Sequence, residues 1–364
     1  MLAAGLQLKL LARSLLTLRQ AEQSMDLDSS TTPSDYRQSD CLITGAAGFI
    51  GSHLTEHLLQ KGIRVTALDN FDPFYPRFLK ESNIASVGRH SRFRFAEIDI
   101  RDASALRGLP GGYDCIIHLA AKAGVRTSIA DPDTYHEVNV IGTRNLLECA
   151  REWGTRQFVF ASSSSVYGIN PTTPWTERDP ALFPISPYAS TKVSGEILGH
   201  IYSHLYGIRF LGLRFFSVYG PRQRPDQAIR KLSELILAGR SIPVFGDGSS
   251  SRDYTYVDDI VSTIRAAIDY RATNYELINV GNSRPIPLLD VIHTIEDALH
   301  KRAVLDFQPE QSGDVPFTCA DIQKAQLLLA YQPSTSFQEG MKRFIDWLTL
   351  EDADRPLTHN SPRE

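Results

Sequence analysis

The chain has 364 residues, of which 42% are hydrophobic and 22% are charged, so it can bury a sizeable core in two unequal lobes. Its net charge of −4 gives no electrostatic footprint for nucleic acid, and it has no basic tract with interleaved aromatic residues. The four cysteines lie far apart in sequence, and three of them sit in apolar or helical stretches. They are typical of reduced core residues in a cytoplasmic protein.

The first 39 residues differ from the rest of the chain. Their leucine-rich start is interrupted by Lys9, Arg13 and Arg19, so it does not reach the ~20 apolar residues that a membrane span requires. Residues 24–38 are polar, and the segment has no unbroken apolar centre with a small-residue cleavage site, as a secretory signal would have. We therefore expect a flexible leader over 1–39 and a flexible tail over 351–364, with no membrane anchor.

From Asp40 onward, short apolar runs alternate with longer amphipathic stretches. Helical patterns lie near residues 49–61, 134–152 and 187–206. The apolar runs predict buried strands at Cys41–Thr44, Ile63–Leu68, Phe93–Ile98, Cys115–Leu119, Gln157–Ala161 and Phe210–Phe215. Strands that alternate with helices predict an α/β fold with a parallel, doubly wound sheet. After Tyr219 the elements shorten, which predicts a smaller second lobe.

A glycine-rich turn, Gly45, Gly48 and Gly51, follows the first strand and begins a helix. The first glycine permits a tight turn, the second lets the backbone approach a pyrophosphate, and the third lets the helix pack closely on the strand. The free N–H groups at the N-terminus of this helix favour phosphate. The GxxGxxG spacing differs from the ordinary GxGxxG dinucleotide fingerprint, and a glycine-rich turn without a ligand is the alternative.

Asp69 ends the second strand, 18 residues after Gly51, where a carboxylate accepts hydrogen bonds from an adenosine ribose. It would repel a 2′-phosphate, so NAD is favoured over NADP. A strand-end turn is the alternative for Asp69, but with the glycines it predicts an NAD site. We expect the next two strand ends to flank the adenine and the pyrophosphate through Asp99, Ile100, Leu119, Ala120 and Ala121.

A Tyr-Ala-Ser-Thr-Lys segment lies on a predicted helix and follows a run of four serines, residues 162–165, at the end of the fifth strand. Tyr188 and Lys192 share one helix face, so the ammonium lies near the phenol and lowers its pKa. A cationic nicotinamide would lower the pKa further, which makes Tyr188 a candidate base. Such a pair alone is more typical of a helix surface, but the serine run marks the crevice at the carboxyl ends of the strands.

Eight ordered motifs over residues 41–348 resemble those of the extended short-chain dehydrogenases/reductases, in particular the nucleotide-sugar epimerases. They are GAAGFIGSH (45–53), HLAA (118–121), VNVIGT (138–143), SSSSVYG (162–168), SPYASTK (186–192), LRFFSVYGP (213–221), SRDYTYVDDI (251–260) and INVGN (278–282). The resemblance implies a Rossmann-type domain with Tyr188 as acid/base, Lys192 as its partner and ribose ligand, and Ser163 as the hydroxyl that orients the sugar. It also implies cofactor contacts from Phe49, Ile50, Asn70, Asn139, Ser162 and Phe215.

The serine run also indicates the reaction. Related 4,6-dehydratases carry Asp-Glu in place of Ser164 and Ser165, and related uronic-acid decarboxylases carry Glu in place of Ser165. Without these carboxylates, oxidation at one carbon and return of the same hydride remain, so the resemblance implies an NAD-dependent 4-epimerase that forms a 4-keto intermediate. The alternatives are a dehydrogenase or ketoreductase with the same Tyr–Lys pair, and a non-catalytic nucleotide-sensing or structural protein on this fold.

The second lobe bears on the substrate. Segments around Arg224, Arg252 and residues 311–316 resemble UDP-glucuronate 4-epimerases, which implies a UDP-sugar substrate. By this resemblance Arg252 pairs with the diphosphate and Ser217 joins Arg224 on the sugar carboxylate, although an arginine fork can also hold a structural carboxylate. Arg126, Ser163, Ser164 and Asp314 complete the expected substrate contacts. Five positions depart from these relatives and leave a UDP-glucose 4-epimerase as the alternative, namely Lys122, Thr127, Ser217, Phe317 and Cys319.

These assignments predict an NAD-binding domain over 40–219, rejoined by parts of 253–282, and a mainly substrate-binding α/β lobe over 220–350. In the family, the long helical stretches pair across a two-fold axis, so the resemblance implies a homodimer. The apolar positions of the second stretch follow helical spacing at Val193, Ile197, Ile201 and Leu205. No metal, nucleic-acid or membrane partner is expected.

Overall fold

The computed structural model describes residues 39–179, 182–309 and 315–353. The predicted leader, apart from Ser39, lies outside the described residues, as do Asp314 and the predicted tail from residue 354 onward. The described residues from Asp40 onward belong to one compact unit. The expected division near residue 219 therefore stays a prediction.

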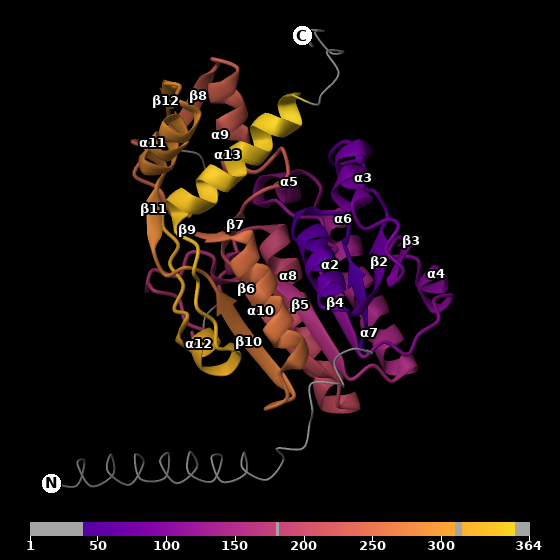
Figure 1. The fold of residues 1–364 in the computed structure, drawn as a ribbon. Coiled ribbons are helices and arrows are strands. Elements are labelled where there is room, and N and C mark those ends of the chain that lie inside the picture. Colours follow the sequence, from indigo (N-terminus) through magenta and orange to yellow (C-terminus); the bar gives the residue numbers. More distant parts are fainter. Residues whose placement is uncertain (1–38, 180–181, 310–314, 354–364) are drawn as a thin grey trace, which may run out of the picture. The chain divides into compact units, whose positions relative to one another are not determined.

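Seven parallel strands form the central sheet, in the order β10-β6-β5-β4-β1-β2-β3 (Figure 1). β3 and β4 lie on opposite sides of β1 and β2, so the chain crosses the sheet between them and the strand order reverses. This is the doubly wound arrangement predicted from the sequence. The strands are β1 (Asp40–Thr44), β2 (Arg64–Asp69), β3 (Phe93–Glu97), β4 (Cys115–His118), β5 (Gln157–Ser163), β6 (Arg209–Phe215) and β10 (Tyr275–Val280). The six predicted strands match the first six of these to within two residues at each end.

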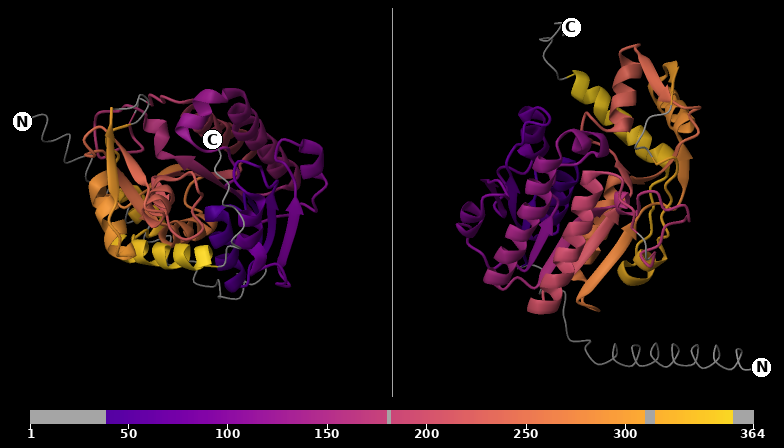
Figure 2. Two further views of the ribbon diagram at one scale, coloured as in Figure 1. Left: turned by 90° about the horizontal axis from the view of Figure 1, so that it is seen from above. Right: turned by 180° about the vertical axis from the view of Figure 1, so that it is seen from behind.

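Helices cover both faces of this sheet, which is why its central strands are near-continuous apolar runs. Figures 1 and 2 show α2 (Phe49–Gln60) and α10 (Val257–Asp269) on one face, and α7 (Gly142–Trp153) and α8 (Pro187–Tyr206) on the other. Smaller helices follow the strands at α3 (Arg77–Ala85), α4 (Ala103–Arg107), α5 (Val125–Ala130) and α6 (Pro132–His136).

The longest of these helices, α8, has clear start and stop signals. The hydroxyl of Ser186 accepts a hydrogen bond from the backbone N–H of Ala189 at 3.2 Å, and Pro187 occupies the first helical position. Gly207 ends the helix in the left-handed conformation, with φ +67°. These signals determine where Tyr188 and Lys192 stand relative to the sheet, because both lie in the first two turns of α8.

A second group of elements stands above the carboxyl ends of β5 and β6. A three-stranded sheet has the order β11-β9-β7, and β8 pairs with β12 in parallel. The strands of this second group are β7 (Ser217–Tyr219), β8 (Ser241–Phe245), β9 (Ser251–Tyr256), β11 (Pro285–Pro287) and β12 (Val304–Gln308). Its helices are α9 (Ala228–Leu237), α11 (Leu288–Leu299) and α13 (Phe337–Ala353). A further helix, α12 (Gln323–Leu329), packs beside β10 of the central sheet (Figure 1).

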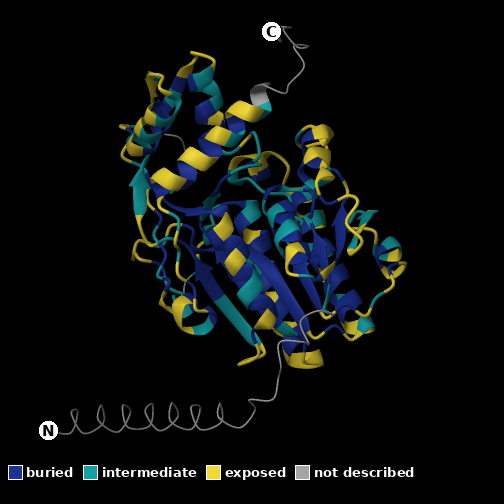
Figure 3. Cartoon of the chain, in the orientation of Figure 1, coloured by how far each residue is buried: buried dark blue, intermediate teal, exposed yellow. Residues whose placement is uncertain are grey.

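Burial follows this arrangement. Figure 3 shows the central strands buried, with exposed residues on the outward faces of the helices. Most of the core is apolar, but a group of charged side chains, including Lys192, Glu196 and Arg214, is also buried near β5 and β6. In the described part of the chain, no helix combines the length and the apolar character needed to cross a membrane.

Candidate active site

A pocket of about 510 Å³ opens at the carboxyl ends of the central strands, below the second group of elements. Its lining combines the ends of β1, β2, β4, β5 and β6 with residues of α8, β7 and α9. This is where ligands bind in open parallel sheets, because the loops diverge on either side of the strand order reversal. The pocket brings together the glycine turn, the serine run and the Tyr–Lys pair, which are far apart in sequence.

The glycine turn after β1 has a shape that only glycine allows at two positions. Gly45 has φ +69°, and a Cβ there would lie 2.8 Å from the backbone nitrogen of Ala120. A Cβ on Gly51 would lie 2.1 Å from the carbonyl oxygen of Gly45, so a side chain would force α2 away from the turn. The N-terminus of α2 therefore faces the pocket at close range, and this cradle fits the pyrophosphate of NAD.

Asp69 lies at the end of β2 inside the pocket and is almost fully buried. Its carboxylate accepts hydrogen bonds from the backbone N–H groups of Ala47 at 3.2 Å and Phe71 at 2.9 Å. The ammonium of Lys80 lies 3.8 Å away. Burial raises the pKa of Asp69, and Lys80 and the two N–H groups act in the opposite direction. Asp69 therefore ends β2 in a turn and also lines the pocket, so both interpretations from the sequence apply to the same residue.

Asp99 and Asn70 lie side by side at the same end of the pocket. The amide of Asn70 donates to Asp99 at 2.9 Å, and the guanidinium of Arg101 donates to both carboxylate oxygens. The hydrogen bonds from Arg101 lower the pKa of Asp99 to about 2. The neighbouring apolar wall comes from Ile100, and Leu119, Ala120 and Ala121 line the pocket after β4.

The serine run forms the opposite wall. Ser162, Ser163, Ser164 and Ser165 all line the pocket. The hydroxyl of Ser163 accepts a hydrogen bond from the backbone N–H of Ser165 at 3.2 Å, so it caps the short 3₁₀ turn Ser164–Tyr167. This cap holds the Ser163 hydroxyl at the end of β5, towards the pocket. No carboxylate occupies the run, in agreement with the sequence.

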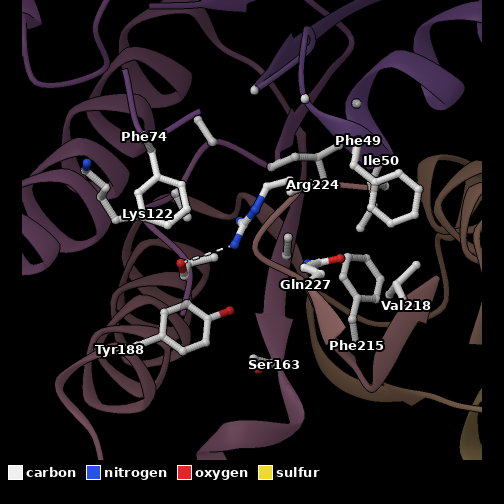
Figure 4. Close-up of a pocket in the computed structure, with 18 of the residues that line it drawn as sticks. Phe49, Ile50, Phe74, Lys122, Ser163, Tyr188, Phe215, Val218, Arg224 and Gln227 are labelled. Atoms are coloured by element: carbon white, nitrogen blue, oxygen red, sulfur yellow. Dashed lines mark hydrogen bonds between the residues drawn. The ribbon is translucent and has the colours of Figure 1, made fainter. Parts of the chain in front are cut away.

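Tyr188 and Lys192 reach the pocket from the first two turns of α8, and Figure 4 shows Tyr188 near Ser163. The ammonium of Lys192 lies 5.8 Å from the centre of the Tyr188 ring and 5.0 Å from the centre of the Phe160 ring. It donates a hydrogen bond to the backbone carbonyl of Ala161 at 2.7 Å. α8 and β5 therefore hold the Lys192 ammonium close to the Tyr188 ring.

Burial opposes the ionisation of both groups of this pair. Burial raises the pKa of Tyr188, and the hydrogen bond with Ser163 and the charge of Arg224 offset only part of this effect. Lys192 directs its ammonium at the Ala161 carbonyl and lies beside the Tyr188 ring, so the expected lowering of the Tyr188 pKa by Lys192 stays a prediction. Burial lowers the pKa of Lys192 to about 8, against an opposing contribution from Glu196.

The second group of elements supplies the remaining wall. Ser217, Arg224 and Arg252 line the pocket from β7, the loop before α9, and β9. In Figure 4 the guanidinium of Arg224 extends into the pocket on the side of Tyr188 and donates to the carbonyl of Ala123 at 3.3 Å. Its charge also meets the face of Phe74, with the ring centre 5.4 Å away.

Two predicted site residues stand outside the pocket lining. Asn139 lies behind the wall, where its side chain is bonded to the backbone of Lys122 and to the hydroxyl of Thr191. The predicted helix over 134–152 is interrupted here by a wider turn, Glu137–Ile141, which turns Asn139 inward. Arg126 lies on α5 with its guanidinium 5.3 Å from the centre of the Phe245 ring.

Several lining residues were not predicted. Lys80, Phe74 and Gln227 all face the pocket, and Lys80 is only 5% exposed. Lys80 carried no signal, because a lysine on a short amphipathic helix is usually solvent-exposed. Lys122 was noted only as a departure from relatives; it lines the pocket and pairs with Asp72 at 3.1 Å.

Comparison with known proteins agrees with this site. Residues 41–281 match the model of the NAD dependent epimerase/dehydratase family. A protein of Methanocaldococcus jannaschii, named "Uncharacterized protein MJ1055", is 42% identical over 322 residues, which cover 87% of this chain and 98% of its own length. "UDP-glucuronate 4-epimerase 4" of Arabidopsis thaliana is 40% identical over 325 residues, covering 84% of this chain and 74% of its own.

The crystal structure of a UDP-glucuronic acid 4-epimerase from Bacillus cereus, in complex with UDP-glucuronic acid and NAD, has the same fold. It superimposes with a TM-score of 0.81 and 39% identity, and the match covers 86% of this chain and 99% of that one. The family model and these relatives extend over most of the chain and include the pocket. The chain therefore belongs to the NAD dependent epimerase/dehydratase family.

Proposed function

We propose that the chain is an NAD-dependent UDP-sugar 4-epimerase that interconverts UDP-glucuronate and UDP-galacturonate. The observation that carries this proposal is the pocket itself, where Tyr188, Lys192 and Ser163 lie across from the glycine cradle while Ser164 and Ser165 provide no carboxylate. Such a site can move one proton and one hydride at a single carbon. The relatives named above include proteins with this activity.

Tyr188 acts on the sugar 4-hydroxyl. As the phenolate it accepts the hydroxyl proton while the hydride leaves carbon 4, and it returns the proton when the hydride comes back. When bound, NAD supplies the hydride acceptor, and its positive nicotinamide ring favours the phenolate. Ser163 donates to the same oxygen, and Lys192 binds the nicotinamide ribose and adds positive charge beneath the phenol.

Inversion requires that the 4-keto sugar present its other face before the hydride returns. We place the diphosphate against Arg252, because a planar guanidinium fork matches phosphate oxygens and holds one end of the substrate still. Tyr188 and Ser163 then form hydrogen bonds with the keto oxygen in either orientation of the sugar ring. Because the hydride is returned, no net oxidation occurs.

A uronate adds one demand, since its 4-keto intermediate is a β-keto acid that readily loses carbon dioxide. Carbon dioxide is lost by breakage of the exocyclic bond between carbon 5 and the carboxylate. Holding that bond close to the plane of the C4 carbonyl denies it overlap with the carbonyl π system. We assign this role to Arg224 and Ser217, which line the pocket and offer a guanidinium and a hydroxyl.

We further propose that the chain works as a cytoplasmic homodimer. The outward face of α8 carries Ile197, Ile201 and Leu205 at 56%, 42% and 60% exposure, and these apolar side chains follow helical spacing. Val193, the fourth predicted member, packs partly against the core. Cys41 and Cys115 are register neighbours on β1 and β4 and are free thiols, as expected of a reducing compartment.

The test is product analysis with purified protein. Incubation with UDP-glucuronate should yield UDP-galacturonate, the reverse reaction should reach the same equilibrium mixture, and NMR of the sugar ring identifies each epimer. Absorbance at the NADH band should stay flat during turnover, because the hydride returns to the sugar. Stoichiometric NADH would instead identify a dehydrogenase, and preferential turnover of UDP-glucose would identify a hexose epimerase.

A further inference from the structure

Behind the pocket lies a buried ion pair that the proposed reaction does not use. Glu196 on α8 and Arg214 on β6 form two parallel hydrogen bonds, from Nε at 2.9 Å and from Nη2 at 2.8 Å, and each side chain is 3% exposed. Burying two charges is costly and gives little net stability compared with apolar residues of similar size. A buried pair at this position therefore calls for a role beyond stability.

The position of Glu196 indicates that role. Glu196 follows Lys192 by one helical turn, so the two side chains lie on the same face of α8. Lys192 donates to the carbonyl of Ala161, and the hydroxyl of Ser162 donates to Glu196 at 2.5 Å. The helix thus holds two consecutive residues of β5 immediately before Ser163.

We propose that Glu196 is a positioning residue of the active site, which fixes the end of β5 beside Ser163 and supplies the negative charge that faces Lys192. The inference deepens the proposed function, on which it rests. Lys192 must carry its proton to serve as a cation beneath the phenol. Its burial works against that proton, and among the charged groups Glu196 works for it.

The other titratable groups around these two side chains fit the assignment. His118 on β4 faces Lys192, but burial lowers its pKa to about 3, so it is neutral in the working range. Arg214 is anchored on its far side by the Tyr167 hydroxyl at 2.9 Å, which donates onward to Asn279 at 2.7 Å. The hydroxyl of Tyr275 on β10 donates to the backbone carbonyl of Glu196 at 3.2 Å. Glu196 is thereby held in place from behind.

The decisive variant removes both charges of the pair and leaves none buried alone. We would compare Glu196→Gln/Arg214→Met with the wild type and with Glu276→Gln/Lys324→Met, a matched control whose ion pair of 2.6 Å joins β10 and α12 outside the pocket lining. The readouts are thermal unfolding, the pH titration of Lys192 by NMR of ¹³Cε-labelled lysine, and the pH profile of kcat/KM. A Lys192→Arg variant assigns the Lys192 signal.

We expect the double variant to fold, and the pKa of Lys192 to fall by about one unit from its wild-type value. The alkaline limb of kcat/KM should move to lower pH by the same amount, because activity is lost when Lys192 loses its proton. The control should change neither quantity. Glu196→Asp, which keeps the negative charge, should return the Lys192 titration towards the wild type.

An unchanged Lys192 titration in a folded double variant would overturn the proposal and leave the pair a purely structural feature. If the double variant fails to fold, the single variant Glu196→Gln decides, because its unpaired Arg214 should lower the pKa of Lys192 still further. The NMR titration needs no substrate. It therefore answers the question even if the protein turns over no UDP-sugar, which separates failure of this inference from failure of the proposed function.

Discussion

Arg224 and Asp226 are joined by two parallel hydrogen bonds, with Nε 2.9 Å from Oδ1 and Nη2 2.7 Å from Oδ2. The same guanidinium lines the pocket, so the two interpretations of Arg224 from sequence, a structural fork and a ligand contact, describe one side chain. Asp226 orients a cation that would otherwise have many rotamers. A guanidinium held in this way is preorganised for a carboxylate.

Arg224→Ala should therefore lower kcat/KM for UDP-glucuronate by about 10- to 100-fold, the loss of a charged hydrogen bond. Residual turnover of UDP-glucose should change far less, because that sugar has no carboxylate. The comparison is made by NMR product assay with both substrates, which also detects any released 4-keto-pentose. Arg224→Lys is the control for charge without the planar fork. Equal losses on both sugars would contradict the uronate assignment.

Tyr188→Phe should reduce turnover by about 10²- to 10⁴-fold, because it deletes the group that accepts the proton while keeping the ring. NAD should stay bound, since the glycine turn and Asp69 are untouched. Initial rates and the absorbance of retained cofactor measure the two effects. As a control, Tyr206→Phe removes an exposed phenol at the far end of α8. A Tyr188→Phe variant of nearly full activity would exclude Tyr188 as the base.

Asp69→Ala should weaken NAD binding about tenfold and reduce discrimination against NADP, since the charge that repels a 2′-phosphate is gone and Lys80 remains. Titration calorimetry with each cofactor measures this. Asp102→Ala is a matched control, because Asp102 also accepts two backbone N–H bonds but lies outside the pocket lining. Equal use of NADP by the wild type would show that Asp69 does not contact the ribose.

Gly51→Ala should destabilise the fold by about 1–3 kcal/mol and abolish tight NAD binding, because its Cβ would lie 2.1 Å from the carbonyl oxygen of Gly45. The unfolding temperature and the Kd for NAD are the measurements. Gly88→Ala serves as the control, since its Cβ would meet nothing closer than 3.5 Å. Wild-type NAD affinity in Gly51→Ala would show that close contact between α2 and the turn is dispensable.

The proposed dimer predicts that Ile197→Glu/Ile201→Glu gives a monomer, because four charges would face one another across a two-fold interface. Light scattering at micromolar concentration measures the mass. Ile169→Glu is the control, since Ile169 is 62% exposed and does not belong to α8. A wild-type protein that is already monomeric at this concentration would refute the proposed dimer.

Local patterns in the sequence determined the strands of the central sheet, the motifs of the cofactor site and the family of this protein. The apolar runs predicted six strands of the central sheet, since a strand covered on both faces must be apolar throughout. The glycine spacing and Asp69 at the end of β2 indicated the cofactor site because each depends on only a few neighbouring residues. The order of motifs indicated the family, which the comparisons confirm.

Only the tertiary structure decided how the charged groups act, because their environment comes from elements far apart in sequence. The hydrogen bond from Lys192 to the Ala161 carbonyl could not be predicted, since it forms only when α8 packs against β5. The inward turn of Asn139 depended on a local widening of the helix that periodicity does not reveal. The pairing of Glu196 with Arg214 joins α8 to β6, and such a contact arises only when helix and sheet pack together.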